Sequence, residues 1–288
     1  MSGQWTADDA ARHLRRPTDR DDKYSRGVVG FRTGSAQYPG AAVLGVEAAW
    51  RTGVGMVRYL GPEFACALVL QRRPETVTVD GRVQAWVVGS GTPVGGEGEP
   101  DATPRGIREI FAGHVPIVVD AGALDHAVGA AAPCIVTPHD REHDRLRSRL
   151  GLPPAEERER EASALHTASA LHGVLVLKGA RTIVATPSGW STVVASGTPW
   201  LATAGTGDVL AGVIGAVVAG SLAKGADGQD RTVHAGELGE LAATGVWLHG
   251  RAATTAAQAR GAGGGPITAL DVAEALPAAV SELLARIA

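Results

Sequence analysis

Aromatic residues and basic charge are both scarce in this sequence. Phe, Trp and Tyr make up 4% of the 288 residues, so a folded core must be built mainly from aliphatic side chains. The formal net charge of -3 provides no basic field that would attract a nucleic acid or an anionic membrane surface. We therefore expect no nucleic acid and no membrane among the partners, although local basic side chains can still bind an anionic small molecule.

Cysteines and long apolar runs are scarce too. The two cysteines, Cys66 and Cys134, lie far apart, and no pair of cysteines or histidines has metal-site or redox spacing. We expect two buried thiols in a reducing compartment and no structural metal. The longest apolar stretch, residues 209–223, is interrupted by glycines and short for a membrane span, and the charged N-terminus is unlike a secretory signal. These features predict a cytoplasmic protein.

Short apolar strands alternate with helices along most of the chain. This alternation predicts an α/β fold with a mainly parallel central sheet and helices on both faces. We expect a polar lead-in over residues 1–25, with one short helix, and a single domain over residues 26–288. The expected strands are 28–31, 54–60, 85–88, 116–119, 134–136 and 174–177 and the hairpin 182–185 with 192–195; the expected helices are 41–52, 156–171, 208–220, 233–260 and 270–287, and 92–105 is expected as a surface loop.

Glycines and chemically active side chains follow the ends of several expected strands. In an open α/β sheet, ligands bind beyond the carboxyl ends of the strands, so we expect a site where these residues converge. Loops are rich in glycine in any case, so the clustering alone does not establish function. The residues concerned are Gly34, Ser35, Gly89, Ser90, Gly91, Asp120, His139, Lys178 and Gly179.

The strongest local signal is the run Gly205-Thr206-Gly207-Asp208 in front of a strongly apolar helix. The glycines let the backbone approach a ligand closely, and we expect Thr206 to cap the helix. The free N–H groups of a helix start favour an anion such as phosphate, and a carboxylate beside that anion can act as a general base. An acid at this position also stabilises a helix start, so a purely structural role for Asp208 stays open.

Other residues carry weaker signals. A lysine at a strand end, such as Lys178, can contact phosphate but is more often a solvated rim residue, and His139 in a loop is more often a bystander than a ligand. We interpret His172, His234 and His249, which lie on or beside expected helices, as structural. The Gly-Thr-Gly-Asp loop lacks the lysine of a Walker P-loop, and no G-x-G-x-x-G run follows the first strand.

Taken in order, these segments resemble the ADP/ATP-dependent NAD(P)H-hydrate dehydratases, a family with a ribokinase-like fold. The resemblance covers residue 23 to the C-terminus, and although Gly-Thr-Gly-Asp is shared with other ribokinase-like enzymes, the ordered set is specific. The matching segments are the opening run 23–60 with Gly-Ser-Ala-Gln-Tyr-Pro-Gly-Ala, the strand Val-Val-Asp-Ala at 118–121, Thr-Pro-His at 137–139, Val-Leu-Lys-Gly-Ala at 176–180, the run 197–212, His-Gly at 249–250 and Leu-Asp-Val at 270–272.

The resemblance implies a reaction and a set of partners. The reaction is dehydration of the S epimer of hydrated NADH or NADPH, with ADP or ATP as co-substrate, restoring NAD(P)H and releasing AMP or ADP and phosphate. It further implies Mg²⁺ as a companion of the nucleotide, with no residue assigned to it, and a homo-oligomer, often a tetramer. Family members with a second activity carry an epimerase domain in front; about 25 residues precede the first strand here, so we expect the dehydratase alone.

The resemblance also implies a role for each matching residue. Asp208 is the expected catalytic base. The hydrated nicotinamide nucleotide is expected to contact Ala41, Gly91, His139 and Asp208. The adenine nucleotide is expected to contact Lys178, Gly179, Ala180, Arg181, Thr182, Gly205, Thr206 and Gly207.

Three segments depart from the family pattern. Asp140-Arg141 stand where Pro-Gly usually follows the histidine, Gly122 replaces a second acid, and residues 89–93 read Gly-Ser-Gly-Thr-Pro where Gly-Pro-Gly-Leu-Gly is usual. Two alternatives therefore stay open. One is a ribokinase-like small-molecule kinase that phosphorylates a thiazole or pyrimidine alcohol, and the other is a non-catalytic adenine-nucleotide sensor.

Overall fold

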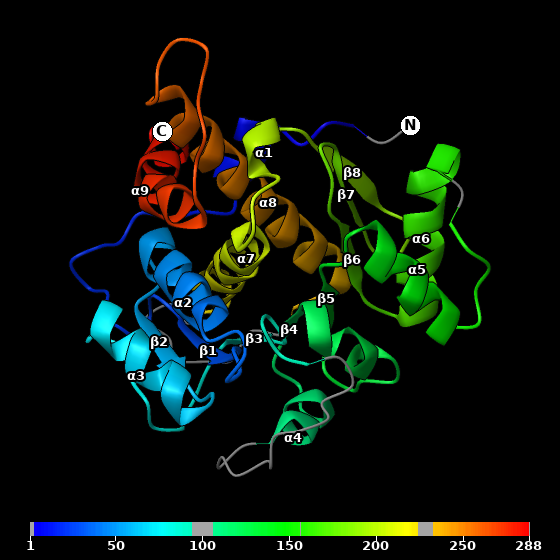
Figure 1. Ribbon diagram of the computed structural model, residues 1–288, viewed down its shortest axis with the longest axis horizontal. Coiled ribbons are helices and arrows are strands. Elements are labelled where there is room, and N and C mark those ends of the chain that lie inside the picture. The colour runs from blue at the N-terminus through cyan, green and yellow to red at the C-terminus, as the bar shows by residue number, and fades with distance from the viewer. Residues whose placement is uncertain (1–2, 94–105, 156, 224–232, 288) are drawn as a thin grey trace.

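A computed structural model describes residues 3–93, 106–155, 157–223 and 233–287, and Figure 1 shows how its elements are arranged. Within these residues, eight strands form one sheet in the order β2-β1-β3-β4-β5-β6-β7-β8. The pairs from β2 to β6 are parallel, and β6-β7 and β7-β8 are antiparallel. The strands are β1 (Val28–Arg32), β2 (Met56–Tyr59), β3 (Ala85–Val88), β4 (Ile117–Val119), β5 (Cys134–Val136), β6 (Val174–Leu177), β7 (Thr182–Ala185) and β8 (Ser191–Val194).

Helices cover both faces of this sheet, as the sequence predicted. One face packs against α2 (Gly40–Thr52), α3 (Glu63–Arg72), α7 (Thr206–Leu222), α8 (Ala235–Gln258) and α9 (Ala269–Leu284). The other face packs against α4 (Ile107–Ala112), the 3-10 helix η2 (Ala121–Ala127), α5 (Asp140–Arg149) and α6 (Arg160–Leu171). Two shorter 3-10 turns, η3 (Glu157–Glu159) and η4 (Pro199–Leu201), lie in the connections before α6 and α7.

The alternation of side chains along each strand divides the core into two clusters. On β3, Val87 points into one cluster while Trp86 and Val88 point into the other. Neighbouring β4 repeats the division, with Val118 on the first side and Ile117 on the second. Successive strand residues face opposite sides of a sheet, so a strand that is apolar throughout must be buried on both faces. This burial holds the strand ends in fixed positions, and the polar residues that follow them are fixed as well.

Several sequence predictions need correction. Helices α3, α4 and α5 were not predicted, and Asp140 and Arg141, which depart from the family pattern, form the first turn of α5. Cys66 and Cys134 are both free, but only Cys134 is buried, since Cys66 is partly exposed. In the expected loop over 92–105, residues 94–105 lie outside the described residues.

The N-terminal lead-in packs against the rest of the protein. It contains the short helix α1 (Ala7–Ala11), whose Ala10 and Ala11 are buried in the cluster formed with α8 and α9. The apolar helix α7 is buried along most of its length between the sheet and α2 and α8. Within the described residues, no helix combines the length and apolar character needed to cross a membrane.

Candidate active site

A cavity of about 470 Å³ lies between the loop after β6, the hairpin strand β8, helix α8 and the start of α7. Six of the eight residues expected to contact the adenine nucleotide line it; Gly205 and Arg181 do not. The Arg181 side chain is exposed to solvent. The six lining residues are Lys178, Gly179, Ala180, Thr182, Thr206 and Gly207.

The start of α7 differs from the predicted arrangement. Gly205, not Thr206, is the N-cap residue, and its φ of 87° lies in the left-handed region that favours glycine. A Cβ on Gly205 would also lie 2.6 Å from Leu44 Cδ1, so only glycine fits. Thr206 is the first helical residue, and its hydroxyl donates to the carbonyl oxygens of Leu201 and Thr203, both at 2.9 Å.

This arrangement leaves the helix start free of a side-chain cap. The first N–H groups of an α-helix have no partner within the helix, and the helix dipole places partial positive charge on them. The Thr206 N–H donates to the Thr203 carbonyl oxygen at 3.4 Å, so the N–H group available to an anion at the cavity is that of Gly207.

A buried carboxylate, Asp120, links the ends of three strands beside this helix start. Its Oδ1 accepts from Thr137 Oγ1 at 2.7 Å and from Lys178 Nζ at 2.9 Å, and its Oδ2 accepts from Ser90 Oγ at 3.0 Å. Lys178 Nζ also lies 3.7 Å from Glu142 Oε2. Burial acts to lower the pKa of Lys178, but Asp120 and then Glu142 outweigh it, and the pKa is raised. Lys178 therefore stays charged at the edge of the cavity.

Asp208 lies in the first turn of α7, on the side of this polar cluster and not on the cavity lining. Burial raises the pKa of Asp208, and the negative charge of Asp120 raises it further, to about 7. Lys178 and the Ser90 hydroxyl act in the opposite direction but do not compensate. A carboxyl group with a pKa near 7 is half ionised at neutral pH, which suits a group that takes up and releases protons.

The expected substrate contacts surround the same strand ends. Gly91 has a φ of 68°, and a Cβ there would lie 2.5 Å from Ala41 Cβ, so the loop after β3 touches the start of α2 directly. His139 is the N-cap of α5: its Nδ1 accepts from the Glu142 N–H at 3.3 Å. Its side chain is 53% exposed, and the carbonyl of the preceding Pro138 accepts from the Lys178 N–H at 2.9 Å. His139 thus has a local capping role that the sequence analysis did not predict.

The sequence analysis missed two parts of the site. Asp120 and Ser90 were noted only as residues at strand ends, and that position was the available signal for their role. His249 was interpreted as structural, but it lines the cavity from the middle of α8. A histidine inside a helical pattern carries no signal in the sequence that separates a core position from a ligand contact.

A comparison with protein families bears on this arrangement. The sequence profile of a family described as NAD(P)H-hydrate dehydratase matches residues 29–277. The chain belongs to the NAD(P)H-hydrate dehydratase family.

Curated relatives agree with this assignment. The bifunctional NAD(P)H-hydrate repair enzyme Nnr of Mycobacterium tuberculosis is 41% identical over 231 residues, which are 76% of this chain and 46% of that protein. The ADP-dependent (S)-NAD(P)H-hydrate dehydratase of Neisseria meningitidis is 33% identical over 259 residues, which are 83% of this chain and 80% of that protein. The chain spans about half the length of the bifunctional relatives it matches.

Solved structures share the fold. The ADP/ATP-dependent NAD(P)H-hydrate dehydratase of Bacillus subtilis, co-crystallized with ATP/Mg²⁺, superposes with a TM-score of 0.78 at 24% identity and covers 98% of this chain and 99% of that one. A ribokinase-like superfamily protein of Enterococcus faecalis gives a TM-score of 0.75 at 22% identity, covering 98% and 96%. The predicted ribokinase-like fold is confirmed.

Proposed function

We propose that this protein dehydrates the S epimer of hydrated NADH and NADPH, with ADP or ATP as the phosphoryl donor. The products are NAD(P)H, phosphate and AMP or ADP. The observation that carries the proposal is the placement of Asp208, a carboxyl group with a pKa of about 7 in the first turn of an uncapped helix. Membership of the NAD(P)H-hydrate dehydratase family and the similarity to the Neisseria meningitidis dehydratase support it.

The chemistry begins with the ring hydroxyl that hydration leaves on the nicotinamide. Hydroxide is a poor leaving group, and phosphorylation converts it into phosphate, which leaves readily. Asp208 accepts the hydroxyl proton while the hydroxyl oxygen attacks the terminal phosphorus of the nucleotide, and the bond to the bridging oxygen breaks. The N–H groups at the start of α7 and the charged Lys178 stabilise the negative charge on the phosphoryl group.

The second stage restores the reduced ring. The lone pair of the ring nitrogen expels phosphate by cleavage of the carbon–oxygen bond, and a proton leaves the neighbouring ring carbon. The balance is one hydrated NADH and one ADP converted into NADH, AMP and phosphate. No residue needs to bond covalently to the substrate at either stage.

The nucleotide binds in the cavity in this proposal, and its metal ion binds mainly to the nucleotide. We assign the nucleotide to the cavity, with Lys178, Gly179, Ala180 and Thr182 on one wall and Thr206 and Gly207 at the phosphate end. Within the described residues, no group of three or more His, Cys, Asp or Glu side chains could hold a metal ion. Mg²⁺ keeps several waters and binds phosphates readily, so we propose that nucleotide oxygens and water supply most of its ligands.

The direct test is recovery of NADH absorbance from chemically prepared hydrate. Purified protein is mixed with the hydrate and Mg²⁺, with ADP, with ATP or with no nucleotide, and released phosphate is measured in parallel. We expect absorbance to return only with a nucleotide, one phosphate being released for each NADH formed. Absence of recovery with both nucleotides would overturn the proposal.

Two other results would identify the alternatives. A stable phosphorylated product from a thiazole or pyrimidine alcohol would identify a small-molecule kinase of the same fold. Nucleotide binding by calorimetry without hydrate-dependent phosphate release would identify a nucleotide sensor. We further propose that the active protein is a cytoplasmic homo-tetramer, which light scattering of the purified protein and fractionation of cells would test.

A further inference from the structure

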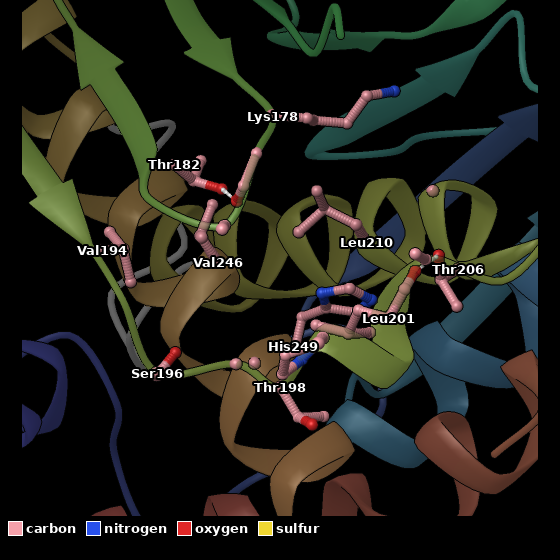
Figure 2. Close-up of a pocket in the computed structure, with 17 residues that line it drawn as sticks. Lys178, Thr182, Val194, Ser196, Thr198, Leu201, Thr206, Leu210, Val246 and His249 are labelled. Atoms are coloured by element: carbon pink, nitrogen blue, oxygen red, sulfur yellow. Dashed lines mark hydrogen bonds between the residues drawn. The ribbon is translucent and has the colours of Figure 1, made fainter. Parts of the chain in front are cut away.

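His249 is a buried side chain with an unused hydrogen-bonding atom. It lies on α8 with 7% of its surface exposed, and its Nε2 has no hydrogen-bond partner. The residue lines the cavity assigned to the nucleotide, and in Figure 2 its ring lies in the middle of the lining, between Thr206 on one side and Val246 on the other. A buried polar atom without a partner destabilises the fold, so such an atom needs an explanation.

The ring is neutral in the free protein. Burial lowers the pKa of His249 to about 4. A hydrogen bond with the Thr206 backbone raises the pKa and the charge of Lys178 lowers it, but neither outweighs burial. A neutral imidazole has one N–H donor and one acceptor nitrogen. A hydroxyl can satisfy Nε2 in either tautomer because it both donates and accepts, whereas an ionised phosphate oxygen can only accept.

The rest of the cavity indicates which part of a nucleotide lies beside this ring. Among the described lining residues, only Lys178 and His249 carry titratable side chains. Lys178 and Gly207 define the phosphate end, since a Cβ on Gly207 would lie 3.7 Å from Lys178 Nζ. Apolar side chains at Val194 and Val246 line the part farther from the start of α7 and suit a flat base. The ring of His249 lies between these two ends, where a nucleotide has its sugar.

We propose that His249 binds the ribose of the adenine nucleotide, with Nε2 hydrogen-bonded to a ribose hydroxyl, and that it thereby selects ribonucleotides over deoxyribonucleotides. This inference rests on the proposed nucleotide site and adds a specificity residue to it. Free protein carries the unpartnered nitrogen, and bound nucleotide satisfies it. His249 is thus a residue that favours binding at the expense of stability in the empty state.

Calorimetry with ADP tests this role through three variants. His249→Leu removes the ring nitrogens, His249→Gln keeps an amide near the position of Nε2, and Thr244→Val is the matched control. Thr244 is a fully buried residue on the same helix whose hydroxyl donates to the Glu240 carbonyl at 2.9 Å, away from the cavity lining. We expect His249→Leu to weaken ADP binding about tenfold, His249→Gln less than about threefold, and Thr244→Val not at all, in line with the loss of one hydrogen bond.

Thermal unfolding without nucleotide separates a binding role from a structural one. His249→Leu removes the cost of burying the unpartnered Nε2 but also the hydrogen bond between the ring and the Thr206 backbone, so it should unfold close to the wild-type temperature. A histidine with a purely structural role would give a clear fall. A clear fall in the unfolding temperature together with unchanged ADP affinity would overturn the proposal.

Nucleotide analogues test the assignment to the ribose. We expect the wild type to bind ADP more tightly than at least one of two analogues, 2′-deoxy-ADP and 3′-deoxy-ADP. His249→Leu should bind ADP and the analogue that the wild type discriminates against equally tightly. Discrimination that survives in His249→Leu would overturn the ribose contact. If the wild type restores NADH with ADP but His249→Leu binds ADP normally, only the role of His249 fails; if the wild type binds no ADP, the proposed function fails with it.

Discussion

Two carboxylates at the inner faces of neighbouring helices are paired in opposite ways. Glu47 on α2 is fully buried and forms ion pairs with three arginines, Arg51, Arg72 and Arg73. Asp208 on α7 faces one ammonium group, Lys178, and that group is hydrogen-bonded to a second acid, Asp120. The two helices pack against each other, and a Cβ on Gly45 of α2 would lie 3.4 Å from the Asp208 carbonyl oxygen.

The pairing determines the charge that each group carries. Burial acts to raise the pKa of Glu47, but hydrogen bonds from Arg73, Arg72 and Arg51 outweigh it, and the pKa is lowered. Burial also raises the pKa of Asp208, and there Asp120 adds to the effect, so the pKa reaches about 7. The carboxylate of Glu47 is fully compensated by cations, whereas that of Asp208 is left under-compensated. Strongly perturbed groups near a cavity are for this reason candidates for function.

Asp208→Asn tests the under-compensated member and should have the largest effect. We expect hydrate-dependent NADH recovery to fall by about two orders of magnitude or more, since an amide cannot act as a general base. The folded state should gain stability at pH 8, because the raised pKa means that ionised Asp208 costs free energy there. That gain should shrink as the pH falls from 7 towards 4, where the carboxyl group is protonated in the fold. Turnover assays and thermal unfolding at several pH values measure both effects.

Asp271→Asn is the matched control, because Asp271 also lies in the first turn of a helix. There the carboxylate completes a capping box with Thr268, and hydrogen bonds from Thr268 lower its pKa. We expect this variant to lose about 1 kcal/mol of stability and to keep its turnover. If both variants lost stability and kept activity, Asp208 would be an ordinary helix-start acid.

Glu47→Gln tests the compensated member. The amide leaves three guanidinium groups around a buried neutral side chain, and loss of one partner of a buried ion pair costs on the order of 3 kcal/mol. Each arginine is partly exposed and can turn towards water, which limits the loss. Urea unfolding should show this decrease, while turnover per folded molecule stays near the wild-type value. A loss of turnover without a loss of stability would contradict the structural role of Glu47.

Most of the fold could be predicted from the sequence because the strands are apolar throughout and the helices between them are long. Strands β3, β5 and β6 have the predicted bounds, since turn residues flank short buried runs at each. Helix α5 was missed because its sequence, residues 140–149, is mostly charged and has only one apolar side chain. Propensity and a capping box form that helix without an apolar stripe.

The site could be predicted only in part, because spacing along the chain does not specify contacts between strands. The run ending at Asp208 predicted a phosphate site. No local pattern indicates that Asp120 accepts a hydrogen bond from Lys178 at 2.9 Å across the sheet. Thr206 was expected to cap α7, and the left-handed backbone at Gly205 took that position instead. A threonine hydroxyl can cap a helix or donate to preceding carbonyls, and here it donates to Leu201 at the end of the 3-10 turn η4 and to Thr203.

Asp120→Asn changes the acid near Asp208 and leaves Asp208 itself in place. In the wild type, kcat/KM should fall about tenfold per pH unit below pH 7, because the protonated form of Asp208 cannot accept the hydroxyl proton. The substitution removes the like charge that raises the pKa of Asp208 and leaves Asp208 and Glu142 as the acids near Lys178. Both changes favour the ionised form of Asp208, so the midpoint of the kcat/KM profile should move about one pH unit lower.

The test depends on the pH at the midpoint of the kcat/KM profile and not on the maximum value of kcat/KM, because Asp120 also positions Lys178. Thr137→Val is the control: it removes a 2.7 Å hydrogen bond to Asp120 and leaves every charge unchanged. We expect the midpoint of that variant to stay near pH 7 even if its rate falls. A midpoint that stays near pH 7 in Asp120→Asn as well would mean that burial alone raises the pKa of Asp208. The contrast with Glu47 would then lie in the smaller number of cations around Asp208 and not in the presence of a second acid.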